Sequence, residues 1–122
     1  HDGIVEKHTG NAPSDATERQ LAAIRAQRFG SYAVDGRVPV NFVADLDITG
    51  GNSGSPVLNA RAELVGLAFD GNYEAISSGW IFNPVLTRTI AVDVRYMLWV
   101  MDAVDGAHSL LKEMGIKPAF ER

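Results

Sequence analysis

The chain has 122 residues, of which 11 are basic and 15 acidic, and its formal net charge is -4. This length allows one domain with a modest core, and the negative charge argues against a general nucleic-acid-binding surface. The sequence has no cysteine, which excludes a zinc ribbon or a redox motif, and no run of 18 apolar residues that could span a membrane. We therefore expect no nucleic-acid partner, no membrane span, no metal and no cofactor.

Residues 1–13 are polar and predict an N-terminal arm, whereas residues 14–122 predict the C-terminal part of a larger domain. The first residue is His1 rather than methionine, and no charged-plus-apolar signal segment is present. We therefore expect the chain to be an excised portion of a longer soluble protein.

A helix is predicted after the arm. Ser14 or Asp15 can cap its N-terminus, and Gly30 can end it. Its buried face would carry Leu21, Ile24, Arg28 and Phe29.

From Tyr32 the apolar period changes from 3.6 to 2, which indicates strands. Asp35-Gly36 predicts a tight turn before a strand over residues 38–42, and Pro39 suggests that this strand lies at an edge or a bulge. A hairpin follows, formed by residues 56–58 and 63–69. Another short strand is expected over residues 88–92.

The C-terminal part predicts two helices. The first, over residues 94–104, would be capped by Asp93 and carry Trp99 on a flank. Its buried face would consist of Val94, Met97, Leu98, Met101 and Val104. The second is expected over residues 107–114, after Gly106. Helices at both ends and strands between them predict an α+β fold.

The run from Thr49 to Leu58, TGGNSGSPVL, places a glycine-framed serine on a turn directly before a strand. Chymotrypsin-type hydrolases present their nucleophile in this way. Glycine permits positive φ, and the N–H groups of Gly51 and Ser53 could converge on one oxyanion. An ordinary turn between two strands is the alternative, but the ten-residue match and its flanks favour the nucleophile.

A nucleophilic serine needs a base, and candidates for the base are few. His1 and His8 lie in the polar arm and His108 lies in the last predicted helix, so we expect each to be a solvated side chain. The chain thus carries half of a catalytic site, and we expect it to be inactive when isolated.

The segment GNSGSPV, Gly51 to Val57, is similar to the nucleophile turn of glutamyl endopeptidases. The longer stretches Val40 to Pro84 and Thr87 to Asp102 resemble the C-terminal end of the bacterial dipeptidyl-peptidase 7/11 family. The resemblance implies a chymotrypsin-like double β-barrel with an inserted helical domain, of which this chain would form part of the nucleophile-bearing half. It further implies a periplasmic or cell-envelope enzyme of a Gram-negative bacterium that releases dipeptides from free peptide N-termini.

Residue by residue, the resemblance implies that Ser53 is the nucleophile and that Gly51 and Ser53 form the oxyanion hole. Asp70 corresponds to the acidic residue that binds the substrate's α-ammonium group. Gly71 stands where family members with acidic specificity carry arginine, which implies an open pocket and hydrophobic P1 residues. The triad histidine and aspartate would belong to the missing N-terminal part of the same protein, and a homodimer is one state open to the full-length protein.

Two alternatives remain at this point. One is a glutamyl-endopeptidase-like endoprotease, and the other is a non-catalytic domain that binds an anion or a peptide through backbone N–H groups. Asp70 disfavours the endoprotease, since an endoprotease must pass the peptide chain through the space that a buried carboxylate would occupy.

Overall fold

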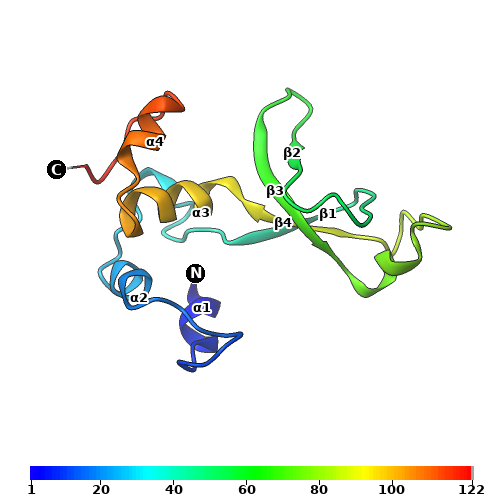
Figure 1. Cartoon of the computed structure of the whole chain (residues 1–122), viewed down its shortest axis with the longest axis horizontal. Helices are drawn as coiled ribbons and strands as arrows, with labels where there is room; N and C mark the ends of the chain where they lie inside the picture. The colour runs from blue at the N-terminus through cyan, green and yellow to red at the C-terminus, as the bar shows by residue number, and fades with distance from the viewer. Residues whose placement is uncertain (122) are drawn as a thin grey trace. The chain divides into compact units, whose positions relative to one another are not determined.

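The computed structural model describes residues 1–121, which form two compact units. One unit combines residues 1–39 with residues 95–121, and the other is Val40–Val94. The first is helical and the second holds an antiparallel sheet (Figure 1), which confirms the α+β class. The half-barrel and the division at residue 13 stay predictions. Within residues 1–121, no helix is both long and apolar enough to cross a membrane.

The sheet unit contains four antiparallel strands in the order β1-β4-β3-β2. The strands are β1 (Asn41–Ala44), β2 (Pro56–Leu58), β3 (Leu64–Gly71) and β4 (Thr89–Asp93). Strand β1 is an edge strand, as predicted, but it begins at Asn41 rather than at residue 38, so Pro39 lies outside it, where no ladder hydrogen bond is lost. The core is small and comprises Val57, Ala68 and Ala91, packed against Phe42, Ile48 and Val65.

Strand β3 carries an irregularity close to its end. Ala68 pairs with Ala91, whereas Asp70 pairs with Ile90, so Phe69 is an extra residue on β3. An extra residue in one strand re-aims the side chains that follow it and increases the local twist. The irregularity therefore sets the direction of the Asp70 side chain.

The helical unit contains α1 (Asp2–Lys7), α2 (Glu18–Arg25), the 3₁₀ turn η1 (Gly30–Tyr32) and α4 (His108–Glu113). Helix α3 (Val94–Trp99) starts directly after β4 and continues into the π-helical turn η3 (Val100–Val104). The predicted cap of α2 is wrong: the Thr17 side chain accepts a hydrogen bond from the Gln20 N–H at 3.2 Å. The helix also ends before Gly30, since Gln27 already has a positive φ of 51°.

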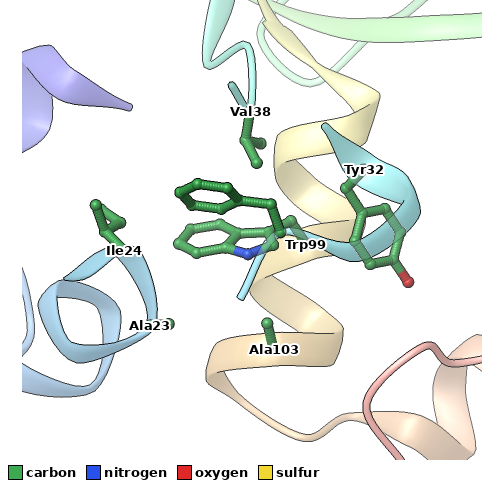
Figure 2. Packing of buried hydrophobic residues seen from close by; sticks show 7 residues of the cluster. Ala23, Ile24, Tyr32, Val38, Trp99 and Ala103 are labelled. Carbon is green, nitrogen blue, oxygen red and sulfur yellow. The ribbon is translucent and has the colours of Figure 1, made fainter. Parts of the chain in front are cut away.

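Trp99 is the centre of the helical core rather than a flanking residue, which corrects the prediction. It is fully buried and packs with Ala23, Ile24, Phe29, Tyr32, Val38 and Ala103 (Figure 2). Its indole N–H donates to the Arg28 carbonyl at 2.6 Å, so the polar atom is satisfied inside the core. The residues predicted to form the buried face are only half-buried, because the side of the helix that meets the core is centred on Trp99 and Ala103.

A buried carboxylate, Asp102, holds the C-terminal segment in place. It accepts hydrogen bonds from the Tyr32 hydroxyl at 2.8 Å and from the Ala119 N–H at 2.6 Å. It also accepts from the Phe120 N–H, and His108 Nε2 lies 3.1 Å from its Oδ1. Burial, together with the hydrogen bond to Asp102 and its charge, raises the pKa of Tyr32 above its ordinary value. The resulting stabilisation is present below about pH 10 and is lost as the pH rises further.

Replacing Asp102 by alanine is expected to release this segment, because the buried Tyr32 hydroxyl and the part-buried N–H groups of Ala119 and Phe120 lose their acceptor. Each unsatisfied buried donor costs about 1–3 kcal/mol, so amide hydrogen exchange at residues 116–121 should accelerate by about 100-fold. Asp105→Ala is the matched control, since Asp105 is exposed and its carboxylate pairs with the exposed Arg19 at 2.8 Å. Equal exchange in the two variants would show that Asp102 does not hold the segment.

Candidate active site

A pocket of about 300 Å³ lies in the sheet unit and brings the predicted site residues together. It is lined by Ile48, Thr49, Gly50, Ser53, Phe69, Asp70, Gly71, Asn72, Ala75, Ile76 and Gly79. Ser53, Asp70 and Gly71 therefore share one pocket, and Gly51 lies on the turn beside it. Residues 1–121 hold no cluster of three histidine or acidic side chains that could bind a metal ion.

The turn that carries Ser53 requires glycine on both sides. Gly51 has a φ of 98° and Gly54 a φ of 85°, values that other residues rarely adopt. The Asn52 side chain closes the turn, because its Oδ1 accepts from the Thr49 N–H at 2.9 Å. The Asn52 N–H in turn donates to the Thr49 carbonyl at 3.2 Å. The turn is thus held in one shape and leaves Ser53 exposed.

Main-chain hydrogen bonds tie this turn to β3. The Gly54 N–H donates to the Ala68 carbonyl at 2.7 Å, and the Ala68 N–H donates to the Ser55 carbonyl at 2.9 Å. Ala68 lies two residues before Asp70 on the same strand. The separation between Ser53 and Asp70 is therefore fixed by backbone rather than by side-chain packing.

The turn also offers two free donors. Among residues 1–121, no protein acceptor is bonded to the N–H of Gly51 or of Ser53. Both residues are exposed. Unpaired N–H groups beside a serine can stabilise the charge that develops on a carbonyl oxygen under attack.

Asp70 lies at the end of β3 and is exposed. One of its carboxylate oxygens accepts from the Gly71 N–H at 2.8 Å. The other has no partner within the described residues 1–121. Asp70 can therefore accept hydrogen bonds from a cationic group in the pocket.

Gly71 is needed for close packing, which corrects the expectation that it leaves open space. A Cβ at this position would lie 2.7 Å from the Ala75 Cβ and 3.1 Å from the Ile48 Cγ2. Ala75 belongs to the 3₁₀ helix η2 (Tyr73–Ser77), which lies against the end of β3. Since the φ of Gly71 is not in the left-handed region, the constraint is steric contact rather than backbone conformation.

Asn72 organises the pocket wall, a role that was not predicted from the sequence. Its Oδ1 accepts from the Arg88 N–H at 2.8 Å, and its Nδ2 donates to the Leu86 carbonyl and to Glu74 Oε2, each at 2.7 Å. These bonds close the base of the loop between β3 and β4. The available signal was an asparagine directly after Asp-Gly, a residue whose side chain often bonds nearby backbone in turns.

The three histidines are partly buried and hydrogen-bonded rather than fully solvated, which corrects the prediction. His1 Nδ1 accepts from the Val38 N–H and His8 Nδ1 from the Ala16 N–H, both at 3.1 Å. His108 contacts the buried Asp102. All three make these bonds within the helical unit, and none lines the pocket that holds Ser53.

Comparison with known families gives a match to the peptidase S46 family over residues 1–116. The chain belongs to the peptidase S46 family. This confirms the resemblance to the dipeptidyl-peptidase 7/11 family, since the curated relatives are named dipeptidyl-peptidases. An Asp/Glu-specific dipeptidyl-peptidase of Shewanella putrefaciens is 49% identical over 138 residues and is matched by 94% of this chain. A dipeptidyl-peptidase 7 of Porphyromonas endodontalis is 43% identical, and the match covers 98% of this chain.

Solved S46 structures show the same fold. DPP11 of Porphyromonas endodontalis in complex with the dipeptide Arg-Glu superposes with a TM-score of 0.90 and 39% sequence identity over 95% of this chain. The matched region is 17% of that structure, and it is 19% and 15% of the two relatives above. The chain therefore spans less than a fifth of the length of these S46 proteins.

The names of the S46 relatives divide between two specificities. Some are Asp/Glu-specific dipeptidyl-peptidases, and others are dipeptidyl-peptidases 7. The expected preference for hydrophobic P1 residues receives no support from these names.

Proposed function

We propose that this chain is the nucleophile-bearing part of a serine dipeptidyl peptidase that releases dipeptides from free peptide N-termini. The observation that carries the proposal is the position of Ser53 and Asp70 in one pocket, in a chain whose S46 relatives are dipeptidyl-peptidases. The whole-enzyme test is turnover of dipeptidyl substrates by the full-length protein and its Ser53→Ala variant.

In this proposal, the Ser53 Oγ attacks the carbonyl carbon of the second substrate residue. A base from outside this chain takes the hydroxyl proton and later gives it to the leaving amine. The N–H groups of Gly51 and Ser53 stabilise the negative oxygen of the tetrahedral intermediate. Water then hydrolyses the acyl-enzyme and releases the dipeptide.

Asp70 sets the length of the product. A free α-ammonium group that binds its unpaired carboxylate oxygen is held at a fixed distance from Ser53. An internal peptide bond has no such cation, so it would leave Asp70 without a partner. This favours an exopeptidase over the glutamyl-endopeptidase-like alternative.

Since the proposal takes the base from outside the chain, the isolated 122-residue chain is expected not to react with a fluorophosphonate at Ser53. Loss of the base from a serine triad costs on the order of 10⁶ in rate. Mass spectrometry of tryptic peptides would detect the adduct. A stoichiometric adduct on Ser53 would contradict this prediction and would assign the base to His1, His8 or His108.

We further propose that the P1 preference is hydrophobic. The pocket walls include the apolar side chains of Ile48, Phe69 and Ile76, and none of its lining residues is a cation. Burying an unpaired P1 carboxylate costs several kcal/mol, whereas burial of an apolar side chain gains about 1.5–3 kcal/mol. The full-length enzyme should therefore have a higher kcat/KM for P1 Leu than for P1 Asp in otherwise identical substrates. Equal values would mean that a cation outside this chain sets the specificity.

The Gly71→Arg variant also tests the P1 preference, because Gly71 lines the same pocket. The structure predicts that this substitution has a steric cost. The new Cβ would meet the Ala75 Cβ, so the single variant should lose activity toward every substrate. Gly71→Arg combined with Ala75→Gly removes that contact, and the guanidinium then supplies a bidentate partner for a carboxylate. The double variant should recover turnover and favour P1 Asp over P1 Leu, as measured by kcat/KM. Ala75→Gly alone is the control and should keep the parent preference.

The resemblance also supports a periplasmic or cell-envelope location in a Gram-negative bacterium. Fractionation of cells that express the full-length protein tests this location.

We also propose that the full-length protein is a homodimer. Light scattering of the purified full-length protein measures its molar mass and so tests the dimer.

A further inference from the structure

The loop between β3 and β4 exposes an apolar surface, which we call the β3–β4 patch. It consists of Tyr73, Ile76, Trp80, Ile81, Val85 and Leu86, each more than half exposed. Trp80 is 93% exposed and Tyr73 is 85% exposed. Figure 1 shows this loop, with η2 at its start, projecting beyond the ends of β3 and β4.

The composition of the loop does not fit a surface that faces water. Between Glu74 and Arg88, the charged residues at its two ends, the loop contains no charged side chain, whereas roughly a quarter to a third of a typical soluble surface is charged. An aromatic side chain can bury about 150–250 Å², so Tyr73 and Trp80 alone approach the 300–600 Å² of the largest patch on an ordinary monomer. A patch of this size and composition indicates an interface.

The loop is also held in a defined shape. Asn72 bonds Arg88 and Leu86 at its base. The buried Ser78 hydroxyl donates to the Ala75 carbonyl at 2.7 Å and also lies 3.2 Å from the Ile48 carbonyl. Thr87 is fully buried, and its N–H donates to the Asn83 carbonyl at 2.8 Å. The patch is therefore a preformed surface, whose docking does not require the loop to fold first.

We propose that the β3–β4 patch docks against the remainder of the same polypeptide, in the part that S46 relatives carry outside the matched region. The matched region is only 15–19% of the relatives' length, although it covers 94% and 98% of this chain. A longer polypeptide therefore supplies far more chain than these 122 residues to cover the patch. Ile76 also lines the pocket of Ser53, so the segment that covers the patch closes one side of that pocket as well.

Docking of the β3–β4 patch requires only a longer polypeptide and is independent of the proposed reaction. It predicts that Trp80 is buried in the full-length protein. The chain contains two tryptophans, and Trp99 is fully buried, so Trp99 is an internal standard of the same chemistry. The experiment is hydroxyl-radical footprinting of the unmodified full-length protein, with oxidation at each tryptophan measured by peptide mass spectrometry.

If the patch is docked, Trp80 should be oxidised at a rate within about three-fold of the rate at Trp99; a solvent-exposed Trp80 should be at least about ten-fold faster than Trp99. The Ser53→Ala variant should show the same protection, which separates docking from catalysis. The protection should also persist at concentrations where light scattering shows a monomer. Rapid oxidation of Trp80 would overturn the proposal, as would protection that disappears on dissociation into monomers, because a second copy would then be the occupant.

Discussion

Replacing Ser53 by alanine in the full-length protein is expected to lower kcat for dipeptidyl substrates by on the order of 10⁶, because the acyl-enzyme can no longer form. Binding should change little, since Ser53 lies on an exposed turn whose shape is set by Gly51, Gly54 and Asn52. Single-turnover kinetics and the dissociation constant of a dipeptide product measure the two effects separately.

Ser55→Ala is the matched control for this variant. Ser55 lies on the same turn, and its N–H and carbonyl bond Asn52 and Ala68 through backbone, which alanine retains. Its kcat should stay within a few-fold of the parent value. If Ser53→Ala kept its activity, the nucleophile assignment would fail. If instead the full-length parent bound dipeptides equally well with and without Ser53 and hydrolysed no substrate, the non-catalytic binding domain would become the better description.

Replacing Asp70 by asparagine is expected to lower kcat/KM for substrates with a free N-terminus by about 30-fold or more. This corresponds to the roughly 2 kcal/mol or more that a charge-assisted contact contributes once desolvated. Asparagine retains an oxygen that can accept from the Gly71 N–H, so the variant removes the charge and keeps the turn. Reaction of Ser53 with a fluorophosphonate should be unchanged, because Asp70 binds the amine and not the acyl group.

N-acetylated substrates provide the decisive comparison for Asp70. They should be poor substrates for the parent enzyme and unaffected by the change, since they have no ammonium group to bind. Asp47→Asn is the control, because Asp47 is exposed in the same unit and does not line the pocket. An equal loss on free and acetylated substrates would show that Asp70 has only a structural role.

The elements that sequence reasoning predicted well are those with strong local signals. The tight turn at Asp35-Gly36 forms with positive φ at both residues, and the hairpin of β2 and β3 follows its alternating pattern and turn residues. The helix after β4 was harder to predict. Its buried side is centred on Trp99 rather than on the predicted apolar residues, and the π turn at Val100–Val104 that follows has no reliable sequence signal.

The candidate site likewise has residues that the sequence indicates locally and contacts that only the structure shows. Ser53 and Gly51 could be named from the sequence, because a glycine-framed serine before a strand is a local feature, whereas the role of Asp70 came only from the resemblance to the dipeptidyl-peptidase family. The contact between Gly71 and Ala75 and the bonds of Asn72 to Leu86 and Arg88 depend on how the loop returns to β4. Such long-range contacts have no local pattern, and the roles of His1, His8 and His108 were mispredicted for the same reason.

The hydrogen bonds between the Ser53 turn and β3 have a consequence for how such an enzyme can diversify. They join backbone groups of Gly54, Ser55 and Ala68, so most side-chain substitutions nearby leave them intact. In the proposed enzyme, the number of residues removed in each cycle would then be inherited with the fold. The side chain preferred at the cleavage point depends instead on the side chains of the loop around Ala75, which paired substitutions such as Gly71→Arg with Ala75→Gly can alter. The preferred P1 side chain could therefore change during evolution while the enzyme continued to release dipeptides.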